Sequence, residues 1–348
     1  MRGPAAHLAT RWGPALATLC GAVAVLLAVS SSSPPAGIGV SETHPPPVRS
    51  VSVLQHAGGV LWWVTGDCRL YRDAMAHQAV DRAPGRFCRA WPSPDGSVVL
   101  AAPREAPTMP PPGRLESLDG HSLQRTALTR LPAELAVGPA AWSPDSLLAA
   151  ICLVTAPAGP HIAVMAAPWR RASTVHDRCS PSFTPTQTLL TTDGRRVFEN
   201  GFDLHLSARL AHAVGAGAGR YRVTALAALP YGLAVAVRGA RRSAIVVVDR
   251  RHGIFRSFAI PGGALELGAD PAGAWIWYRD AVRDRCLLLP MLPPPPAGLP
   301  RVAAGFAFSP DGRYAAAALA GRVVVVDTRS GARGVITADN ARALVWTR

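Results

Sequence analysis

The sequence contains no lysine, so all 36 of its basic residues are arginine, against 22 acidic residues and a formal net charge of +14. An arginine-only sequence that is also rich in alanine, proline and glycine is typical of a GC-rich genome, which weakens a functional interpretation of the charge. The arginines are scattered, and no long basic run with interleaved aromatic residues occurs, which argues against a nucleic-acid partner. A positive surface still favours anionic lipid headgroups or cell-wall polymers.

Catalytic motifs are missing as well. No Gly-x-Ser-x-Gly elbow is present, which argues against a propeller-linked α/β-hydrolase, and neither a His-Glu-x-x-His nor a Cys-x-x-Cys motif occurs. The ten histidines are dispersed along the chain. The sequence therefore predicts a non-enzymatic protein with no catalytic residue, no cofactor and no metal site.

Charged residues are few, at 17%, whereas apolar residues make up 49% of the chain. This balance predicts a folded protein with a large core. The 33 prolines and 32 glycines favour short elements that are joined by many turns.

The N-terminus has the pattern of an export segment. Arg2 and Arg11 precede an uncharged stretch of about 17 residues, 13–29, and the first acidic residue is Glu42. Positive charge before the apolar stretch predicts an N-terminus inside the cell and a remainder outside it. Residues 1–30 are thus expected to be a signal peptide or an uncleaved signal-anchor helix, and residues 31–49 a Pro/Ser-rich spacer. The protein would be a single-pass membrane protein, or secreted if the signal is cleaved.

One turn recurs between apolar segments in residues 50–348. "SPDG" occurs at residues 93–96 and 309–312, and "SPDS" at 143–146. Proline presets φ at the second turn position, aspartate bonds nearby amides and glycine accepts a positive φ. The predicted turn markers are Pro94, Asp95, Gly96, Pro144, Asp145, Pro310, Asp311 and Gly312. Calcium binding by the aspartates is the alternative interpretation.

The turns have a regular period. Looser copies place prolines at 185, 230 and 271, so that successive turn prolines, starting from Pro94, are 50, 41, 45, 41 and 39 residues apart by subtraction. Short strands repeating at about 40–45 residues predict the blades of a β-propeller. We expect an all-β propeller of about seven four-stranded blades, with six as the alternative. The C-terminal segment "ARALVWTR" from Ala341 resembles the start of a repeat, and we expect it to close the ring with the N-terminal copy.

The copies "WSPDS" at Trp142 and "FSPDGRYAAAAL" at Phe308, and more loosely "WPSPDG" at Trp91, resemble the TolB-like and WD-repeat-like propellers of bacterial envelopes. The resemblance implies a fold rather than a function, because these families share blade-forming residues.

Five cysteines follow the export segment, and export permits disulfides. The candidate pairs are Cys68–Cys88 and Cys152–Cys179, with buried free thiols as the alternative, and Cys286 is the candidate free thiol. Trp62-Trp63 and Trp275-Ile276-Trp277-Tyr278 are expected on second strands, with neighbouring side chains facing opposite blades. A sugar-stacking platform is the alternative role for these rings.

Together these features predict a membrane-tethered extracytoplasmic scaffold that binds a protein or an envelope polymer, using the loops at one end of the ring. The alternatives are a sensor of a small ligand or glycan in the central funnel, and a propeller hydrolase or lyase.

Overall fold

The computed structural model describes residues 49–50, 53–75, 79–103, 113–131, 134–155, 159–166, 170–175, 180–217, 220–289 and 295–348. The chain divides into two units, Met1–Pro45 and Pro46–Arg348, and every described residue belongs to the second. The predicted export helix at residues 1–30 and most of the predicted spacer lie outside the described residues. Within the described part of the chain, no helix is long and apolar enough to span a membrane.

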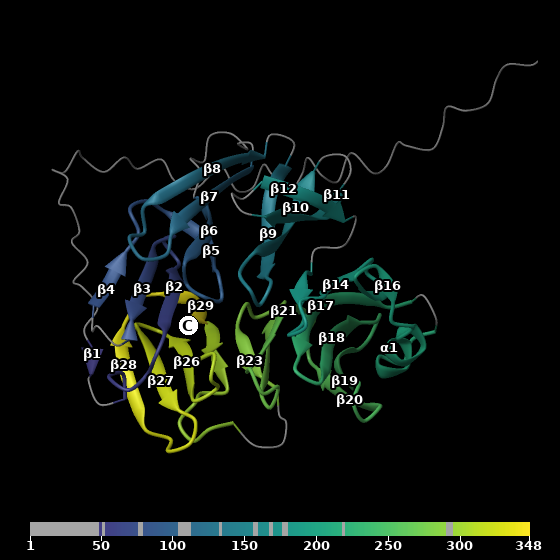
Figure 1. Cartoon of the computed structure of the whole chain (residues 1–348). Helices are drawn as coiled ribbons and strands as arrows, with labels where there is room; N and C mark the ends of the chain where they lie inside the picture. The colour runs from purple at the N-terminus through teal and green to yellow at the C-terminus, as the bar shows by residue number, and fades with distance from the viewer. Residues whose placement is uncertain are drawn as a thin grey trace, which may run out of the picture. The chain divides into compact units, whose positions relative to one another are not determined.

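The described residues form seven antiparallel sheets, which are the blades of a propeller (Figure 1). Blade 1 contains β29 (Ala341–Thr347), β2 (Val60–Thr65), β3 (Leu70–Ala74) and β4 (Ala79–Arg82). Blade 2 contains β5 (Phe87–Pro92), β6 (Val98–Pro103), β7 (Gly113–Asp119) and β8 (Arg125–Leu131). Blade 3 contains β9 (Glu134–Trp142), β10 (Leu148–Thr155), β11 (Gly159–Ala166) and β12 (Arg170–Val175). Blade 4 contains β13 (Ser182–Phe183), β14 (Leu189–Thr192), β15 (Val197–Glu199) and β16 (Phe202–Asp203).

The remaining blades follow in chain order. Blade 5 contains β17 (Arg222–Leu229), β18 (Gly232–Arg238), β19 (Ser243–Asp249) and β20 (Ile254–Ile260). Blade 6 contains β21 (Ala264–Ala269), β22 (Ile276–Asp280), β23 (Cys286–Leu288) and β24 (Val302–Ala303). Blade 7 contains β25 (Gly305–Phe308), β26 (Tyr314–Leu319), β27 (Arg322–Asp327), β28 (Arg333–Thr337) and, at its edge, β1 (Arg49–Ser50). The described residues thus confirm the prediction of seven blades, and β1 begins one residue before the predicted boundary at residue 50.

The ring closes through both ends of the chain. Each blade contacts the next, and blade 7 contacts blade 1 through β25 and β29. In blade 1 the C-terminal strand β29 pairs antiparallel with β2, with Val60 opposite Thr347 and Val64 opposite Ala343. The predicted closure by the segment from Ala341 is therefore confirmed.

Apolar clusters fill the spaces between blades, because each blade has two apolar faces and a single sheet cannot bury both. Strand β27 is an example, with Val323 and Val325 facing blade 1 and Val324 and Val326 facing blade 6. Trp63 packs toward blade 7 and Trp62 toward blade 2, and Trp277 and Tyr278 likewise join opposite clusters. The tryptophans and Tyr278 are thus packing residues, as the alternation along a strand predicts.

One short helix, α1 (Ser207–Ala213), lies in the connection from β16 to β17. Its Leu210 and Ala211 are buried in the cluster between blades 4 and 5, beside Val235. The helix extends this interface where strand β16 has only two residues.

Successive strands of a blade are antiparallel, so their turns alternate between the two ends of the ring. One end, here called the Pro-turn end, carries the turns between first and second strands and those between third and fourth strands, and includes Pro94, Pro144 and Pro310. The other, the connector end, carries the turns between second and third strands and the segments that link one blade to the next.

Candidate binding face at the Pro-turn end

The predicted turn markers share one hydrogen-bonding scheme. In the turns of blades 2, 3 and 7, the carbonyl of Ser93, Ser143 or Ser309 accepts a bond of 2.8–2.9 Å from the N–H of the fourth residue. That fourth residue has a positive φ in every case, 72° at Gly96, 64° at Ser146 and 68° at Gly312. Glycine accepts this conformation freely, and the serine of "SPDS" adopts it in the same role.

The serine hydroxyl adds two side-chain hydrogen bonds to the backbone bond of each turn. Ser309 Oγ accepts the N–H of Tyr314 at 2.8 Å and donates to Asp311 Oδ1 at 2.6 Å. Asp311 Oδ1 also accepts the N–H of Arg313 at 3.0 Å. Ser93 with Asp95 and Ser143 with Asp145 repeat the pattern. The aspartates predicted as turn formers thus bond to their own turns.

These bonds also set the pKa of each turn carboxylate. Burial would raise the pKa of Asp95 and Asp311, but the serine hydroxyls and backbone N–H groups outweigh it and hold both below their usual value. The hydroxyl of Ser143 and the N–H of Leu147 lower the pKa of Asp145. Each aspartate is therefore held as an anion that caps a turn.

Two other turns show that different side chains can replace the serine. Thr184 Oγ1 accepts the N–H of Thr188 at 3.0 Å, and Asp270 Oδ1 accepts the N–H of Trp275 at 2.6 Å. Asp270 is buried, and burial raises its pKa against the opposing effect of these backbone bonds. The turn at Pro230 differs, because Leu229 and Gly232 pair directly and leave a two-residue hairpin.

A second set of aspartates, which are not among the predicted turn markers, caps the turns after the third strands. Oδ1 of Asp119, Asp249 and Asp327 each accepts two successive backbone N–H groups, as in the bonds from Arg329 at 2.9 Å and Ser330 at 3.0 Å to Asp327. Asp249 and Asp327 each follow a run of valines and precede a glycine by four residues, a signal that could have identified them.

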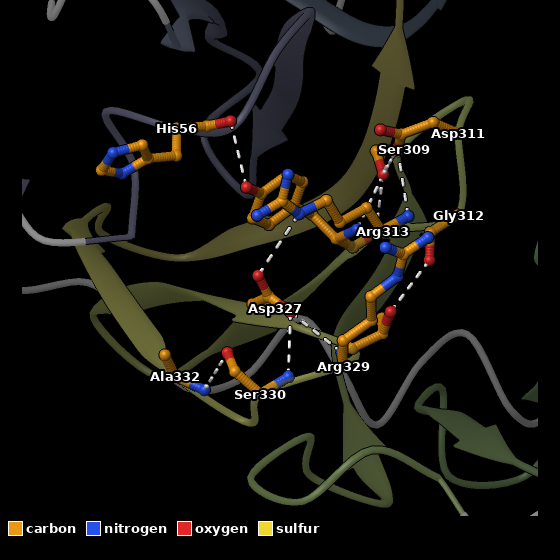
Figure 2. Close-up of polar contacts among 11 residues, drawn as sticks. His56, Ser309, Asp311, Gly312, Arg313, Asp327, Arg329, Ser330 and Ala332 are labelled. Atoms are coloured by element: carbon orange, nitrogen blue, oxygen red, sulfur yellow. Dashed lines mark hydrogen bonds and ion pairs between the residues drawn. The ribbon is translucent and has the colours of Figure 1, made fainter.

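Figure 2 shows how the two kinds of turn meet in blade 7. Arg313 Nε lies 3.4 Å from Asp327 Oδ2, and Thr328 Oγ1 donates to the carbonyl of Gly312 at 3.0 Å. The hydroxyl of Tyr314 donates to the carbonyl of His56 at 3.0 Å. The Pro-turn of this blade is thereby tied to the neighbouring turn and to the chain that enters blade 1.

Bonds between blades connect the turns along this end of the ring. The Asp95 N–H donates to Ser146 Oγ at 3.2 Å, from blade 2 to blade 3. The Arg348 N–H donates to the Pro94 carbonyl at 3.0 Å, and the Tyr231 hydroxyl donates to the Gly273 carbonyl at 2.7 Å. Because adjacent turns hold one another, this end is a preorganised surface.

The blade 4–5 part of this end exposes large apolar side chains. Phe202 is 78% exposed at the start of β16, and Ile254 is 43% exposed at the start of β20. Glu199 Oε2, at the end of β15, and Arg250 Nη1, in the turn before β20, form an ion pair of 2.7 Å. The ion pair links the hairpin that carries Phe202 to the hairpin that carries Ile254. Leu147, on the adjacent blade 3, is also exposed at this end.

The cysteines divide between bonded and free states. Cys68 and Cys88 form a disulfide that links blade 1 to the start of blade 2. Cys152 is also disulfide-bonded, while Cys179, its candidate partner, lies outside the described residues. Cys286 is a free, buried thiol whose pKa burial raises to about 12.

Comparison with known proteins supports the fold alone. No family model and no curated protein sequence matches this chain. Among solved structures, the chain is similar to a functionally unknown protein from Desulfotomaculum acetoxidans, with a TM-score of 0.55, 11% identity and coverage of 84% of this chain and 99% of that one. A chain in the mitotic checkpoint complex gives a TM-score of 0.51 with 12% identity, over 90% and 98% of the two chains.

TolB from Acinetobacter baumannii also matches, with a TM-score of 0.44, 13% identity and coverage of 83% of this chain and 66% of that one. The resemblance to TolB-like and WD-repeat-like propellers that the repeats suggested is one of fold, since the described residues form a seven-bladed propeller. Within the described residues, no group of three or more His, Cys, Asp or Glu side chains is arranged to hold a metal ion.

Proposed function

We propose that this protein is a non-enzymatic scaffold that binds a protein partner at the Pro-turn end of blades 4 and 5. The observation that carries the proposal is the exposure of Phe202 and Ile254 at the starts of β16 and β20, in two hairpins that the Glu199–Arg250 ion pair links. An exposed aromatic side chain on a rigid surface is typical of a binding hot spot, because few side chains or loops lose conformational freedom when a partner binds. A chain of similar fold occurs within the mitotic checkpoint complex.

We further propose that the scaffold works outside the cytoplasm, tethered by its N-terminal segment. The disulfide between Cys68 and Cys88 and the bonded state of Cys152 support this address, because disulfides persist in oxidising compartments. The apolar stretch at residues 13–29, with arginines before it, supports the tether.

The test compares two variants that each remove one exposed apolar side chain. Phe202→Ser changes the proposed face, and Val302→Ser changes blade 6, where Val302 is 42% exposed. Affinity capture from cross-linked cell envelopes should recover a specific protein with wild type and with Val302→Ser. Loss of a hot-spot aromatic should weaken recovery by Phe202→Ser about tenfold or more.

Equal recovery by both variants, or no specific protein with folded wild type, would overturn the assignment of this face. Turnover in a broad hydrolase screen, retained in Phe202→Ser, would overturn the non-enzymatic assignment.

A further inference from the structure

The connector end of blades 4, 5 and 6 carries exposed arginines for which the described residues provide no ion-pair partner. We call this group the basic sector, and it consists of Arg195, Arg222, Arg238, Arg241, Arg242 and Arg283. The acidic side chains near these arginines pair with other arginines or accept backbone N–H groups. Asp193 pairs with Arg196 at 3.0 Å, and Asp284 and Glu266 pair with Arg279 at 2.8 and 3.6 Å. Asp280 is buried and accepts the N–H groups of Val282 and Arg283.

Backbone pairing and side-chain contacts bring the basic sector together across three blades. Arg222 on β17 lies directly opposite Arg238 on β18. The Arg238 side chain extends over Gly263, since a Cβ at Gly263 would lie 3.6 Å from Arg238 Cδ and 3.6 Å from Ala281 Cβ in the blade 6 turn. On the other side, the Tyr221 hydroxyl donates to the Arg195 carbonyl at 2.7 Å. The arginines therefore share one surface.

This arrangement is unfavourable for the protein alone. Like charges directly opposite on neighbouring strands destabilise a sheet, and Arg222 and Arg238 occupy such a pair. An external anion would relieve the repulsion. Guanidinium groups match the geometry of phosphate oxygens and are weakly hydrated, so phosphate is the anion that suits them best.

Apolar side chains project from the same surface. Val282, at the tip of the blade 6 turn beside Arg283, is 81% exposed. Leu265 is 53% exposed and is the extra residue of a β-bulge, between Ala264, which pairs with Asp280, and Glu266. A soluble polyanion offers no apolar phase for these side chains, whereas a membrane surface combines phosphates with acyl chains.

We propose that the connector end of blades 4–6 binds the surface of an anionic phospholipid membrane. The basic sector contacts the headgroup phosphates, while Val282 and Leu265 enter the boundary between headgroups and acyl chains. This contact is separate from the N-terminal segment and from the proposed protein-binding face. It orients the ring so that the Pro-turn end, with Phe202 and Ile254, faces away from the bilayer.

The test reads the local environment of this surface in the full chain. Val282→Cys is labelled with an environment-sensitive fluorophore in a Cys20→Ser background, and Leu147→Cys, on the opposite end and 62% exposed, is the matched control. The native Cys286 is buried and does not compete for label. Each protein is mixed with vesicles of phosphatidylcholine alone or with added phosphatidylglycerol.

The label at position 282 should shift to the blue with phosphatidylglycerol vesicles and not with neutral ones, and salt should reverse the shift. The label at position 147 should not shift with either. No shift at 282, or an equal shift with neutral vesicles or at 147, would overturn the proposal. Insertion driven by the N-terminal segment alone would give one of these results.

A second pair of variants, made in the chain that is labelled at position 282, separates the effect of the basic sector from the effect of net charge. The triple variant Arg222→Gln, Arg238→Gln and Arg283→Gln should bind phosphatidylglycerol vesicles about 100-fold more weakly, at the usual contribution of each arginine near an anionic surface. The control, Arg251→Gln, Arg329→Gln and Arg348→Gln, removes the same charge from the Pro-turn end and should bind like the unsubstituted labelled chain. Equal loss in both would overturn the proposal. A response to soluble polyphosphate without a response to vesicles would instead assign a polyanion site.

Discussion

At the scale of single residues, each turn serine hydroxyl bonds to two groups of its own turn. Ser309 is buried and satisfies the Tyr314 N–H while it also holds the Asp311 carboxylate. A buried N–H that loses its acceptor is costly, because neither water nor another group replaces the bond.

Ser309→Ala should therefore lower the free energy of unfolding by about 1–3 kcal/mol. The control is Ser330→Ala in the same blade, since Ser330 is exposed and its Oγ accepts only a 3.2 Å bond from the Ala332 N–H among the bonds shown in Figure 2. Urea unfolding of the two variants checks the prediction, and equal losses would contradict it.

The turn carboxylates predict a pH dependence. The pKa of Asp311 is below its usual 3.8 in the folded state, so the carboxylate stabilises the fold above that value and loses this contribution as the pH falls through the folded pKa. Asp311→Asn keeps an oxygen that accepts the same bonds but does not titrate. The difference in unfolding free energy between wild type and Asp311→Asn should shrink between pH 5 and pH 2, on the order of these pKa values.

Unfolding titrations across that pH range measure the difference. Ser330→Ala, at an exposed hydroxyl of the same blade that does not titrate, is the control and should run parallel to wild type in acid. Parallel behaviour of Asp311→Asn would show that the turn carboxylate does not contribute as described.

The sequence predicted these turns because Ser-Pro-Asp-Gly restricts the backbone to one conformation. It did not predict that the side chains of Thr184 and Asp270 accept the backbone N–H that serine accepts in the other turns, since the residues after them lack the Asp-Gly pair. The exposure of Phe202 and Ile254 could not be predicted either, because it depends on an ion pair between residues 51 apart in the chain.

At the scale of elements, the sequence pattern predicts a strand and its buried faces only where the strand is long. Runs such as Val323 to Val326 are apolar on both faces, which requires a neighbouring blade on each side. Strands β13, β16 and β24 have two residues each, too few for an alternating pattern to identify them. Their position is imposed by pairing with longer neighbours.

The Cys68–Cys88 disulfide joins two blades across 20 residues of chain, and removing it should cost about 3 kcal/mol through the greater entropy of the unfolded chain. Cys68→Ala with Cys88→Ala should show that loss in thermal unfolding.

Cys88→Ala alone should gain one alkylated thiol in the native protein. Cys286 should stay unreactive until unfolding, because burial raises its pKa to about 12. Equal alkylation of wild type and Cys88→Ala would contradict the pairing.

At the scale of the whole molecule, stability depends on the junction between blades 7 and 1. Trp346 is buried there, stacks on Tyr314 with 6.1 Å between ring centroids, and donates its indole N–H to the Gly58 carbonyl at 3.1 Å. Trp346→Ala should cost about 3–5 kcal/mol in unfolding free energy. Arg342→Ala, at an exposed bulge position of the same strand, should cost far less. Equal costs would show that β29 does not close the ring through its buried face.

Closure by β29 has a consequence for the order of folding. Strand β2 is among the earliest parts of the ring to be made, and its partner β29 is the last. Until residues 341–347 emerge, blade 1 has an unpaired edge, and a free edge can pair with another chain. The slow step should therefore be the meeting of the two ends, at a sequence separation close to the full length of the ring. A nascent chain arrested before Ala341 would remain an open ribbon of blades, prone to join its neighbours edge to edge.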